Sequence, residues 1–343
     1  MTSFTIASNQ GEMGGGEVML LQIAEAARDL GHEVTVVGPE APSDLCDRAA
    51  DAGFEVVRIP GEAAASYLRN LRHWDRKHRR GLLWCNGLRP AFATAGRRGR
   101  VEHLHQIPTG RLQLLHFVAR RGALRTVVPS QTMQRLVAGS VVLPNWSSAA
   151  PDRPRRAVAD EVTVGFLGRL SRDKGVLVLV EALRILQGRA PTRYRLLLAG
   201  ETRFVPPAEA AAVERSIVGL GSVVDRVGWI DRDEFFARID LAAFPSVAPE
   251  SFGLVAAEAM AARCPFVVSD SGALPEVAGR DHPWIVAQGD AEHLAEMIEK
   301  AASTPQDEIV ERSYRRWLQH YSPAAGHEAL SKLLGELERE GTS

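Results

Sequence analysis

The sequence predicts an α/β protein with two domains, each built on a parallel sheet that helices cover on both faces. Three observations support this fold class. Short β-branched runs alternate with amphipathic stretches along the chain. The alternation pauses once, in a small, proline-bearing and basic segment, and then restarts. The length of 343 residues is what about two domains of ordinary size require.

The first half of the chain contains seven apolar runs that predict strands, at residues 4–7, 33–37, 54–59, 82–85, 101–104, 126–128 and 141–143. The clearest helix between them is expected over residues 18–30, where apolar residues recur at helical spacing. It should stop at Gly31, because glycine adopts the left-handed C-cap conformation at little cost. Strands that alternate with helices in this way form parallel sheets with both faces covered.

The second half repeats the pattern after a predicted linker at residues 146–160. Strands are expected at residues 162–167, 195–199, 224–227, 241–244, 266–269 and 284–286, and helices at 176–187, 208–220, 234–239, 252–262 and 291–302. The last forty residues look all-helical, with apolar anchors at Tyr314, Trp317, Leu318 and Tyr321. The expected domains are therefore residues 1–148 and 149–310, followed by helices over 311–343. Two such halves imply a cleft between them, where ligands commonly bind.

Composition and charge argue against several classes of protein. Hydrophobic residues make up 45% and charged residues 24% of the chain, the balance of a soluble globular protein. The longest apolar runs are far shorter than the roughly 18–20 residues that cross a bilayer, and the N-terminus lacks the pattern of a signal peptide. The widely spaced Cys46, Cys85 and Cys264 offer no disulfide framework or zinc pattern, so we expect a cytoplasmic protein. A net charge of -1 gives no general case for nucleic-acid binding.

Positive charge is concentrated in residues 69–125, where fourteen arginines and lysines face only Asp75 and Glu102. One interpretation is a set of solvated helix faces, since an arginine-rich sequence scatters arginine freely. The other is a basic surface that makes weak contact with an anionic membrane or an anionic acceptor.

Glycines cluster at Gly14, Gly15 and Gly16, directly before Glu17 and after the first predicted strand. Glycine lets a ligand approach the backbone closely, and the unpaired N–H groups of a helix N-terminus attract an anion. A flexible turn is the simpler alternative. The spacing does not match G-x-G-x-x-G, so a Rossmann dehydrogenase is disfavoured.

Arg169 and Lys174 lie in the loop after the first strand of the second half. Loops at the carboxyl ends of parallel strands are where α/β proteins bind ligands. A guanidinium fork together with an ammonium charge suits a diphosphate. The segment is not a P-loop, because G-x-x-x-x-G-K-[ST] is missing. A solvated loop is the alternative.

Glu250 and Glu258 flank the start of the helix expected over residues 252–262. Backbone N–H groups at that helix start should be unpaired. Glu258 shares a helical stripe with apolar residues, and burying an unpaired carboxylate costs several kcal/mol. It therefore needs a donor, which is either a structural partner such as an arginine or the two hydroxyl groups of a bound sugar or ribose.

His103 and His105 come at the end of a predicted strand, two residues apart and so on the same side. A metal site would need a third ligand, and the sequence shows none. The remaining alternatives are a packed histidine with satisfied hydrogen bonds and a histidine that donates to a substrate hydroxyl.

Taken together, these motifs resemble those of the retaining glycosyltransferases of family 4, which have the GT-B architecture of two Rossmann-like domains facing a cleft. The matching elements stand in the same order along nearly the whole chain, at residues 14–17 with 31–34, 168–170 with 174–175, 250–258 and 272–276. The resemblance implies C-terminal helices that pack back toward the N-terminal, acceptor-binding domain. The chain departs from the family at residues 144–146, where Pro-Asn-Trp stands for the usual Pro-Asn-Gly.

The resemblance implies roles for residues of the second domain. Arg169 and Lys174 would hold the diphosphate of a nucleotide-sugar. Glu258 would bind the ribose hydroxyls, and Glu250 the hydroxyls of the transferred sugar. The backbone N–H groups of Phe252, Gly253 and Leu254 would face the phosphate and the sugar.

The resemblance also implies roles in the first domain. Gly15 and Gly16 would bind the donor, with Gly16 letting the domain close onto the phosphate. His105 matches the family's histidine that touches the donor sugar near the reacting carbon, and His103 is the reserve candidate.

The expected activity is therefore a metal-independent, retaining hexosyl transfer from a UDP- or GDP-sugar, without a cofactor. The short first domain favours a small intracellular acceptor such as a natural-product precursor, whereas the arginine-rich stretch favours a lipid or lipid-linked glycan. A non-catalytic nucleotide-sugar-binding protein is the alternative from another class. Intact Arg169, Lys174 and Glu250 argue against it, and the E-x7-E element argues against a nucleotide-sugar epimerase.

Overall fold

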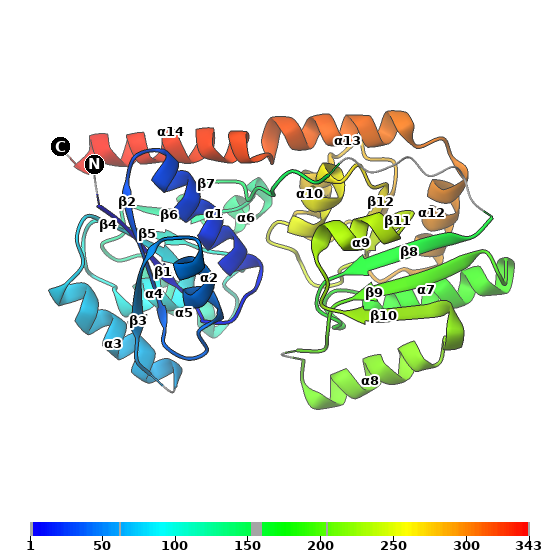
Figure 1. Cartoon of the computed structure of the whole chain (residues 1–343), viewed down its shortest axis with the longest axis horizontal. Helices are drawn as coiled ribbons and strands as arrows, with labels where there is room; N and C mark the ends of the chain where they lie inside the picture. The colour runs from blue at the N-terminus through cyan, green and yellow to red at the C-terminus, as the bar shows by residue number, and fades with distance from the viewer. Residues whose placement is uncertain (1–2, 62, 152–159, 204, 342–343) are drawn as a thin grey trace. The chain divides into compact units, whose positions relative to one another are not determined.

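The structure is a computed structural model that describes residues 3–61, 63–151, 160–203 and 205–341. These residues form two compact units (Figure 1). The first unit runs to Asn145 and also takes the segment from Ala324 onward, while the second runs from Trp146 to Pro323. Most of the expected linker, residues 152–159, lies outside the described residues.

The first unit is built on a seven-stranded parallel sheet with strand order β3-β2-β1-β4-β5-β6-β7. Its strands are β1 (Ser3–Ser8), β2 (Glu33–Pro39), β3 (Glu55–Ile59), β4 (Leu82–Asn86), β5 (Arg100–His103), β6 (Arg125–Val128) and β7 (Ser140–Val142). Branched and aromatic side chains alternate between the two faces of these strands. All seven strands expected from the sequence are present, with bounds that differ by no more than two residues.

Helices cover both faces of this sheet. They are α1 (Gly15–Asp29), α2 (Asp44–Asp51), α3 (Ala64–Lys77), α4 (Leu88–Ala93), α5 (Arg111–Ala119), α6 (Gln131–Leu136) and α14 (Pro323–Gly341). On one face, Leu71 of α3, Ala91 of α4 and Ala119 of α5 pack against strand residues such as Leu83. On the other face lie α1 and the part of α14 that belongs to this unit (Figure 1).

The second unit is built on a six-stranded parallel sheet with strand order β10-β9-β8-β11-β12-β13. Its strands are β8 (Val162–Leu167), β9 (Tyr194–Ala199), β10 (Val224–Gly228), β11 (Leu241–Phe244), β12 (Phe266–Ser269) and β13 (Ile285–Val286). In both sheets the strand order reverses direction beside the first strand, next to β4 in one and β11 in the other. The loops at such a reversal are where open α/β sheets bind ligands.

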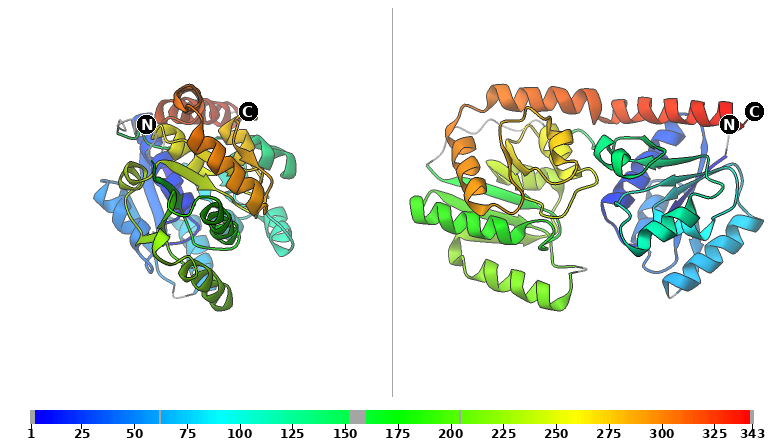
Figure 2. Two further views of the ribbon diagram at one scale, coloured as in Figure 1. Left: turned by 90° about the vertical axis from the view of Figure 1, so that its right-hand side faces the viewer. Right: turned by 180° about the vertical axis from the view of Figure 1, so that it is seen from behind.

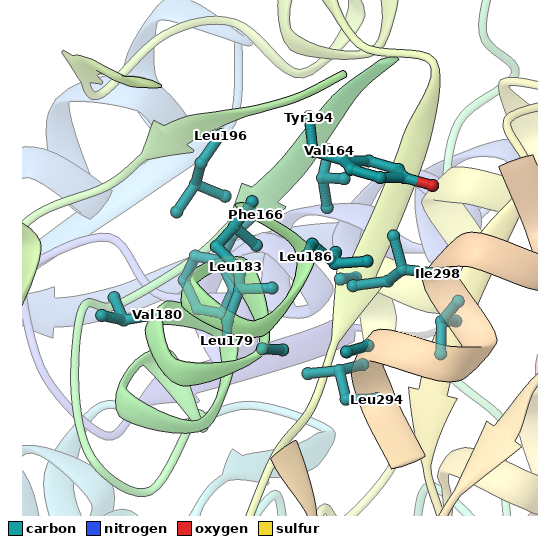
Figure 3. Close-up of a cluster of buried hydrophobic side chains, with 14 of the residues drawn as sticks. Val164, Phe166, Leu179, Val180, Leu183, Leu186, Tyr194, Leu196, Leu294 and Ile298 are labelled. Atoms are coloured by element: carbon teal, nitrogen blue, oxygen red, sulfur yellow. The ribbon is translucent and has the colours of Figure 1, made fainter. Parts of the chain in front are cut away.

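Two groups of helices sandwich the second sheet. They are α7 (Val176–Arg189), α8 (Pro207–Val218) and α12 (Ala291–Ser303) on one face, and α9 (Arg232–Arg238), α10 (Leu254–Ala261), α11 (Leu274–Ala278) and α13 (Asp307–His320) on the other. Figure 3 shows the core between the second sheet and α7, where Phe166 of β8 packs with Leu183 of α7 and Ile298 of α12. Seen from behind in Figure 2, α13 runs beside α10, with which it is in contact.

Three structural expectations need correction. The first helix begins at Gly15 rather than residue 18. Helix α10 begins at Leu254 rather than residue 252, because its N-cap residue Gly253 has a left-handed conformation with φ of 94°. Leu318 is 54% exposed and so is not a buried apolar anchor, unlike Trp317, which is buried. Among the described helices, none has the length and apolar character that crossing a membrane requires.

Candidate functional site

Two loops of the second unit bring a lysine and a glutamate into contact at the carboxyl edge of its sheet. Lys174 follows β8, and its Nζ lies 2.5 Å from Oε1 of Glu250, which follows β11. The hydroxyl of Ser246 donates to the same carboxylate oxygen at 2.6 Å. Both side chains are partly exposed, at 34% for Lys174 and 15% for Glu250. The pair is therefore fixed in position yet open to a ligand.

Backbone contacts explain why these loops meet. The N–H groups of Val247 and Ala248 both donate to the carbonyl oxygen of Asp173, at 2.8 and 3.0 Å. Gly175 has a φ of 77°, and a Cβ there would lie 1.8 Å from the carbonyl oxygen of Pro245. Only glycine allows that approach, so this residue lets the Lys174 loop lie directly on the loop after β11.

A second glycine sets the backbone of Glu250. Gly272 has a φ of 60°, and a Cβ there would lie 2.3 Å from both the nitrogen and the carbonyl oxygen of Glu250. The carbonyl of Glu250 also accepts a hydrogen bond from the N–H of Ala273 at 2.9 Å. The turn after β12 thus fixes the position of the Glu250 backbone.

Arg169 lies in the same loop as Lys174, directly after Gly168. It is partly buried, and its Nε is enclosed without a hydrogen-bond partner among the described residues. Nor does its guanidinium form an ion pair within those ranges. The guanidinium is therefore available to an anionic ligand, and its planar fork matches phosphate oxygens.

The N-terminus of α10 adds three backbone donors. The N–H groups of Phe252, Gly253 and Leu254 find no acceptor in the part of the chain that the structure describes. The Phe252 ring is buried and meets Tyr321 edge to face, with 5.4 Å between ring centroids. Free N–H groups at a helix start attract negative charge. The packed ring holds this segment in place.

Glu258 lies on α10, one turn beyond those donors. Burial raises the pKa of its carboxyl to about 7, against the opposing attraction of Arg232. Arg232 itself donates to Asp233 and to two backbone carbonyls. Among the described residues, none donates a hydrogen bond to Glu258. Arg232, the kind of structural partner considered from the sequence, therefore acts on Glu258 through its charge and not through a hydrogen bond. The carboxylate of Glu258 can still accept hydrogen bonds from two hydroxyl groups.

The second unit therefore presents two cations, a helix N-terminus and a partly buried carboxylate. The cations Arg169 and Lys174 and the α10 N–H groups match the oxygens of a diphosphate. Glu258 matches a vicinal diol such as that of ribose, and Glu250 matches further hydroxyl groups. A nucleotide-sugar contains all of these groups.

The first unit places His105 against the glycine-rich start of α1. A Cβ on Gly16 would lie 3.4 Å from the His105 ring. Asn86 joins the two, because its Nδ2 donates to the Gly16 carbonyl at 2.9 Å and its Oδ1 lies 2.8 Å from His105 Nε2. The proton of neutral His105 is therefore on Nε2. The N–H groups of Gly15 and Gly16 have no acceptor among the described residues.

His103 lies beside His105, with 4.1 Å between the ring centroids, but it is fully buried. Its Nδ1 accepts a hydrogen bond from the indole of Trp84 at 3.3 Å. Burial lowers the pKa of His103 well below the usual value, so the ring stays neutral. His103 is therefore a packed core histidine, but its Nε2 is buried without a hydrogen-bond partner among the described residues, so its hydrogen bonds are only half satisfied. The less buried His105 is the better candidate for substrate contact.

Sequence reasoning missed several residues that complete the two sites. Asn86 and Ser246 position His105 and Glu250, yet both are single polar residues near a strand end with no motif around them. In the sequence, Glu17 stands out only as part of the glycine motif. It is buried, which raises the pKa of its carboxyl to about 7, and Gln10 donates to it at 3.3 Å. For Asn86 and Ser246 the available signal was a polar residue at, or just after, the carboxyl end of a predicted strand.

The described residues contain no group of three or more His, Cys, Asp or Glu side chains arranged to hold a metal ion. The cations and helix donors of the second unit are the groups positioned to meet negative charge.

Both halves of the chain match known families. Residues 13–146 match the family described as Glycosyltransferase Family 4. Residues 161–304 match the family described as Glycosyl transferases group 1. The two matches cover most of the first and second units, and they include every candidate residue named above.

Relatives with named activities point the same way. The chain is 28% identical to a phosphatidyl-myo-inositol mannosyltransferase of Mycolicibacterium smegmatis over 313 residues, which are 82% of this chain and 79% of that protein. It is 30% identical to a D-inositol 3-phosphate glycosyltransferase of Saccharomonospora viridis over 220 residues, which are 60% of this chain and 48% of that protein.

Solved structures share the fold. Anabaena HepE, crystallised with UDP and glucose, superposes with a TM-score of 0.83 at 22% identity, covering 98% of this chain and 100% of that one. The sucrose-phosphate synthase of Thermosynechococcus elongatus also has a TM-score of 0.83, at 19% identity over 99% of this chain and 100% of that one. The fold class expected from the sequence is confirmed.

Proposed function

Because the chain belongs to glycosyltransferase family 4 and has the GT-B fold, we propose that it transfers a hexose from a nucleotide-diphosphate sugar to an acceptor with retention at the reacting carbon. The single observation that carries this proposal is the cluster in the second unit. Arg169, Lys174, the start of α10 and Glu258 together offer the groups that a diphosphate and a ribose require.

The proposed chemistry is the cleavage of the bond between the sugar carbon and the diphosphate oxygen. Positive charge develops on the sugar ring, and negative charge develops on the leaving diphosphate. Arg169, Lys174 and the N–H groups of α10 would stabilise the leaving group. The acceptor oxygen would attack from the face that the diphosphate leaves, and a diphosphate oxygen would take the acceptor's proton.

Glu250 and His105 are assigned to the transferred sugar. Glu250 has one carboxylate oxygen occupied by Lys174 and Ser246, so its other oxygen can accept from sugar hydroxyls. His105 would be a neutral hydrogen-bonding group, because burial lowers its pKa to about 4. Its Nε2 proton is already held by Asn86. We assign it to substrate contact rather than to proton transfer.

We further propose that the reaction needs no divalent metal, because the two cations and the helix start can balance the charge of the leaving group. Activity should then be unchanged after treatment with EDTA. Activity that EDTA abolishes and Mg²⁺ restores would contradict this part of the proposal.

For the acceptor, the named activities of the relatives favour a phosphorylated polyol. One relative is named for phosphatidylinositol and the other for inositol 3-phosphate. The two share an inositol ring that carries a phosphate, in a lipid or in a free form. The expectation of a small soluble acceptor and its lipid alternative thus become two arms of one assay.

The test begins with a thermal-shift screen against UDP, GDP, ADP and TDP and their sugars, which identifies the donor. Transfer is then assayed with inositol 3-phosphate and with phosphatidylinositol in vesicles, and the anomeric configuration of the product is read by NMR. An inverted product would overturn retention. Donor binding with neither transfer nor donor hydrolysis would favour the non-catalytic alternative.

We also propose a cytoplasmic location. The three cysteines are buried and free, which supports a reducing compartment.

A further inference from the structure

Helix α5 exposes an apolar surface that the rest of the described first unit leaves uncovered. Leu114 and Phe117 are 71% and 59% exposed, and Leu112 and Leu115 add to the same short helix. Ala119 is its only buried residue. Leu114 and Phe117 are three residues apart and so share one side of the helix. Clusters of exposed apolar side chains mark interaction sites.

This exposure does not come from a loose helix. Arg100 is fully buried and donates from its guanidinium to the carbonyls of Ala119 and Arg121, at the end of α5. His116 of α5 bonds Glu102 at 3.1 Å. The helix is therefore held along its inner side while its apolar outer side faces solvent.

A hollow with a volume of about 500 Å³ adjoins α5. Its walls come from α3, from α4 with the turn after it, and from the end of α5, and they include Leu68, Phe92 and Val118. Arg69, Arg72 and Arg121 stand among the lining residues. The Arg121 guanidinium also lies over the Phe117 ring, 5.2 Å from its centroid. An apolar floor edged by arginines suits an acyl chain below an anionic head group.

The stretch of sequence that forms α3, α4 and α5 exposes side-chain charge of one sign. Between residues 63 and 151 the only acidic residues are Asp75 and Glu102, and both are buried. Asp75 is paired with Arg79 at 2.7 Å, and Glu102 accepts from Thr126 at 2.9 Å. The basic residues of this stretch that reach solvent therefore have no acidic neighbour from it.

The arginine-rich stretch as a whole is less basic on the surface than its sequence indicates. Arg100 is inside, Arg79 is paired with Asp75, and Arg72 donates to the carbonyl of Ala93 at 2.9 Å. Arg111, Arg120 and Arg121, next to the apolar side chains of α5, remain exposed and form no ion pair among the described residues.

We propose that this α5 face docks on an anionic phospholipid membrane. The α5 face comprises Leu114 and Phe117 of α5, the adjacent hollow and the arginines Arg69, Arg111, Arg120 and Arg121. Leucine and phenylalanine insert at the boundary between head groups and acyl chains, while arginines meet the anionic head groups. Apolar side chains and unopposed arginines on one face satisfy both requirements of a peripheral membrane surface.

The α5 face also has a position relevant to the first-unit site. His105 and Arg111 are six positions apart, in the loop that joins β5 to α5. Docking through α5 would hold the loop that carries His105 close to the lipid surface. The docking proposal stands independently of the transfer reaction, because vesicle binding is measured without donor or acceptor.

The experiment is vesicle flotation with phosphatidylcholine alone and with added phosphatidylglycerol, at low and high salt. The wild-type chain should float with the anionic vesicles, and high salt should weaken this binding. Leu114→Glu/Phe117→Glu should reduce binding by about tenfold or more, since it removes the inserting side chains and adds like charge. Arg120→Gln/Arg121→Gln should remove the preference for phosphatidylglycerol.

Leu136→Glu is the matched control, because Leu136 of α6 in the same unit is 61% exposed and lies outside the α5 face. It should float like the wild type. Equal melting temperatures would show that the variants fold. Unchanged flotation of the Leu114→Glu/Phe117→Glu variant would overturn the proposal, as would equal binding to neutral and anionic vesicles. A wild-type dimer that this variant converts to a monomer, without vesicle binding, would instead assign the face to a second copy of the chain.

Discussion

Lys174 and Glu250 form an ion pair of 2.5 Å across two loops that are separated by 76 positions in the sequence. Each partner fixes the other, so neither behaves as an isolated charge at the sheet edge. Glu250 holds the ammonium where a diphosphate would lie, while Lys174 turns one oxygen of Glu250 away from a ligand. Removing either partner would therefore alter both of the proposed roles, and a substitution beside the pair is needed to separate them.

Replacing Lys174 by alanine should reduce transfer by more than about tenfold, or roughly 1.4 kcal/mol in the barrier. In the proposed reaction the ammonium would meet charge that grows on the leaving diphosphate, so the loss should fall mainly on kcat. Arg172→Ala is the control, because Arg172 lies in the same loop but is exposed. Steady-state kinetics of both variants checks this, and near wild-type turnover of the Lys174→Ala enzyme would refute the site.

Ser246→Ala isolates the positioning of Glu250. A hydrogen bond to a charged group contributes about 1.5 kcal/mol or more, so transfer should fall by about tenfold while the ion pair with Lys174 survives. The affinity for the free nucleoside diphosphate should be unchanged, because the Ser246 hydroxyl bonds Glu250 and Lys174 keeps its own bond to that carboxylate. Calorimetric binding of the nucleotide beside kinetics separates the two effects. A parallel loss of nucleotide affinity would indicate a general disruption of the loop.

Gly272→Ala should displace Glu250, because the added methyl group would meet the Glu250 backbone at 2.3 Å. Gly221→Ala is the matched control, since Gly221 has a similar φ of 66° and open space around a Cβ. Both variants should lose about 1 kcal/mol of unfolding free energy from the left-handed backbone, and Gly272→Ala should lose more. Only Gly272→Ala should also lose transfer. Urea denaturation and activity assays of the two variants measure this contrast.

Glu258 should make donor binding depend on pH. Its pKa is raised to about 7 in the free protein, and hydroxyl groups donate best to the ionised form. Affinity for the nucleotide-sugar should therefore rise by about tenfold between pH 6 and pH 8, the change in the ionised fraction of a group with this pKa. The intact nucleotide-sugar is the required probe, because a free nucleoside diphosphate also titrates in this range.

Two variants test whether Glu258 is the source of that dependence. Glu258→Gln should bind weakly and without a pH trend, and Glu258→Ala should lose transfer by more than about tenfold. Glu17→Gln should keep the wild-type trend, although the pKa of Glu17 is also raised to about 7. A pH trend that vanishes in the Glu17 variant and persists in the Glu258 variant would reverse the assignment.

Asn86→Asp should give His105 a new titration. In the wild type, burial lowers the pKa of His105 to about 4, so the ring stays neutral from about pH 5.5 upward. An aspartate 2.8 Å from Nε2 would favour the imidazolium and raise that pKa. Ring NMR signals and a new acidic limb in the pH–rate profile would report this. Asn86→Ala, which lacks the charge, should lower the rate without adding the limb.

The strands and the four motifs could be predicted because they depend on local chemistry. Runs such as residues 162–167 are β-branched and apolar, and Gly31 adopts the left-handed cap with φ of 88°. Contacts between residues far apart in the sequence could not be predicted. Asn86 meets His105 only because β4 and β5 are neighbours in the sheet, and nothing in either segment states that pairing.

Whether a given side chain is buried or exposed was likewise hard to predict. Arg100 and Arg120 look alike in the sequence, yet one is enclosed among backbone carbonyls and the other is exposed. Leu114 and Phe117 fit a helix with a buried side, but the sheet beneath is already covered through Ala119. Tertiary packing decides both outcomes, and a periodic pattern alone carries no information about it.

The chain passes between the two units twice, after Asn145 and again after Pro323. A fragment that stops at Asn145 would therefore lack α14, whose leucines Leu330, Leu333, Leu334 and Leu337 are buried. Such a fragment should aggregate on expression, and joining residues 324–341 to it through an engineered linker should restore a soluble first lobe. The final helix therefore has to be treated as part of the first unit when gene fusions, split reporters or truncation libraries of this enzyme are designed.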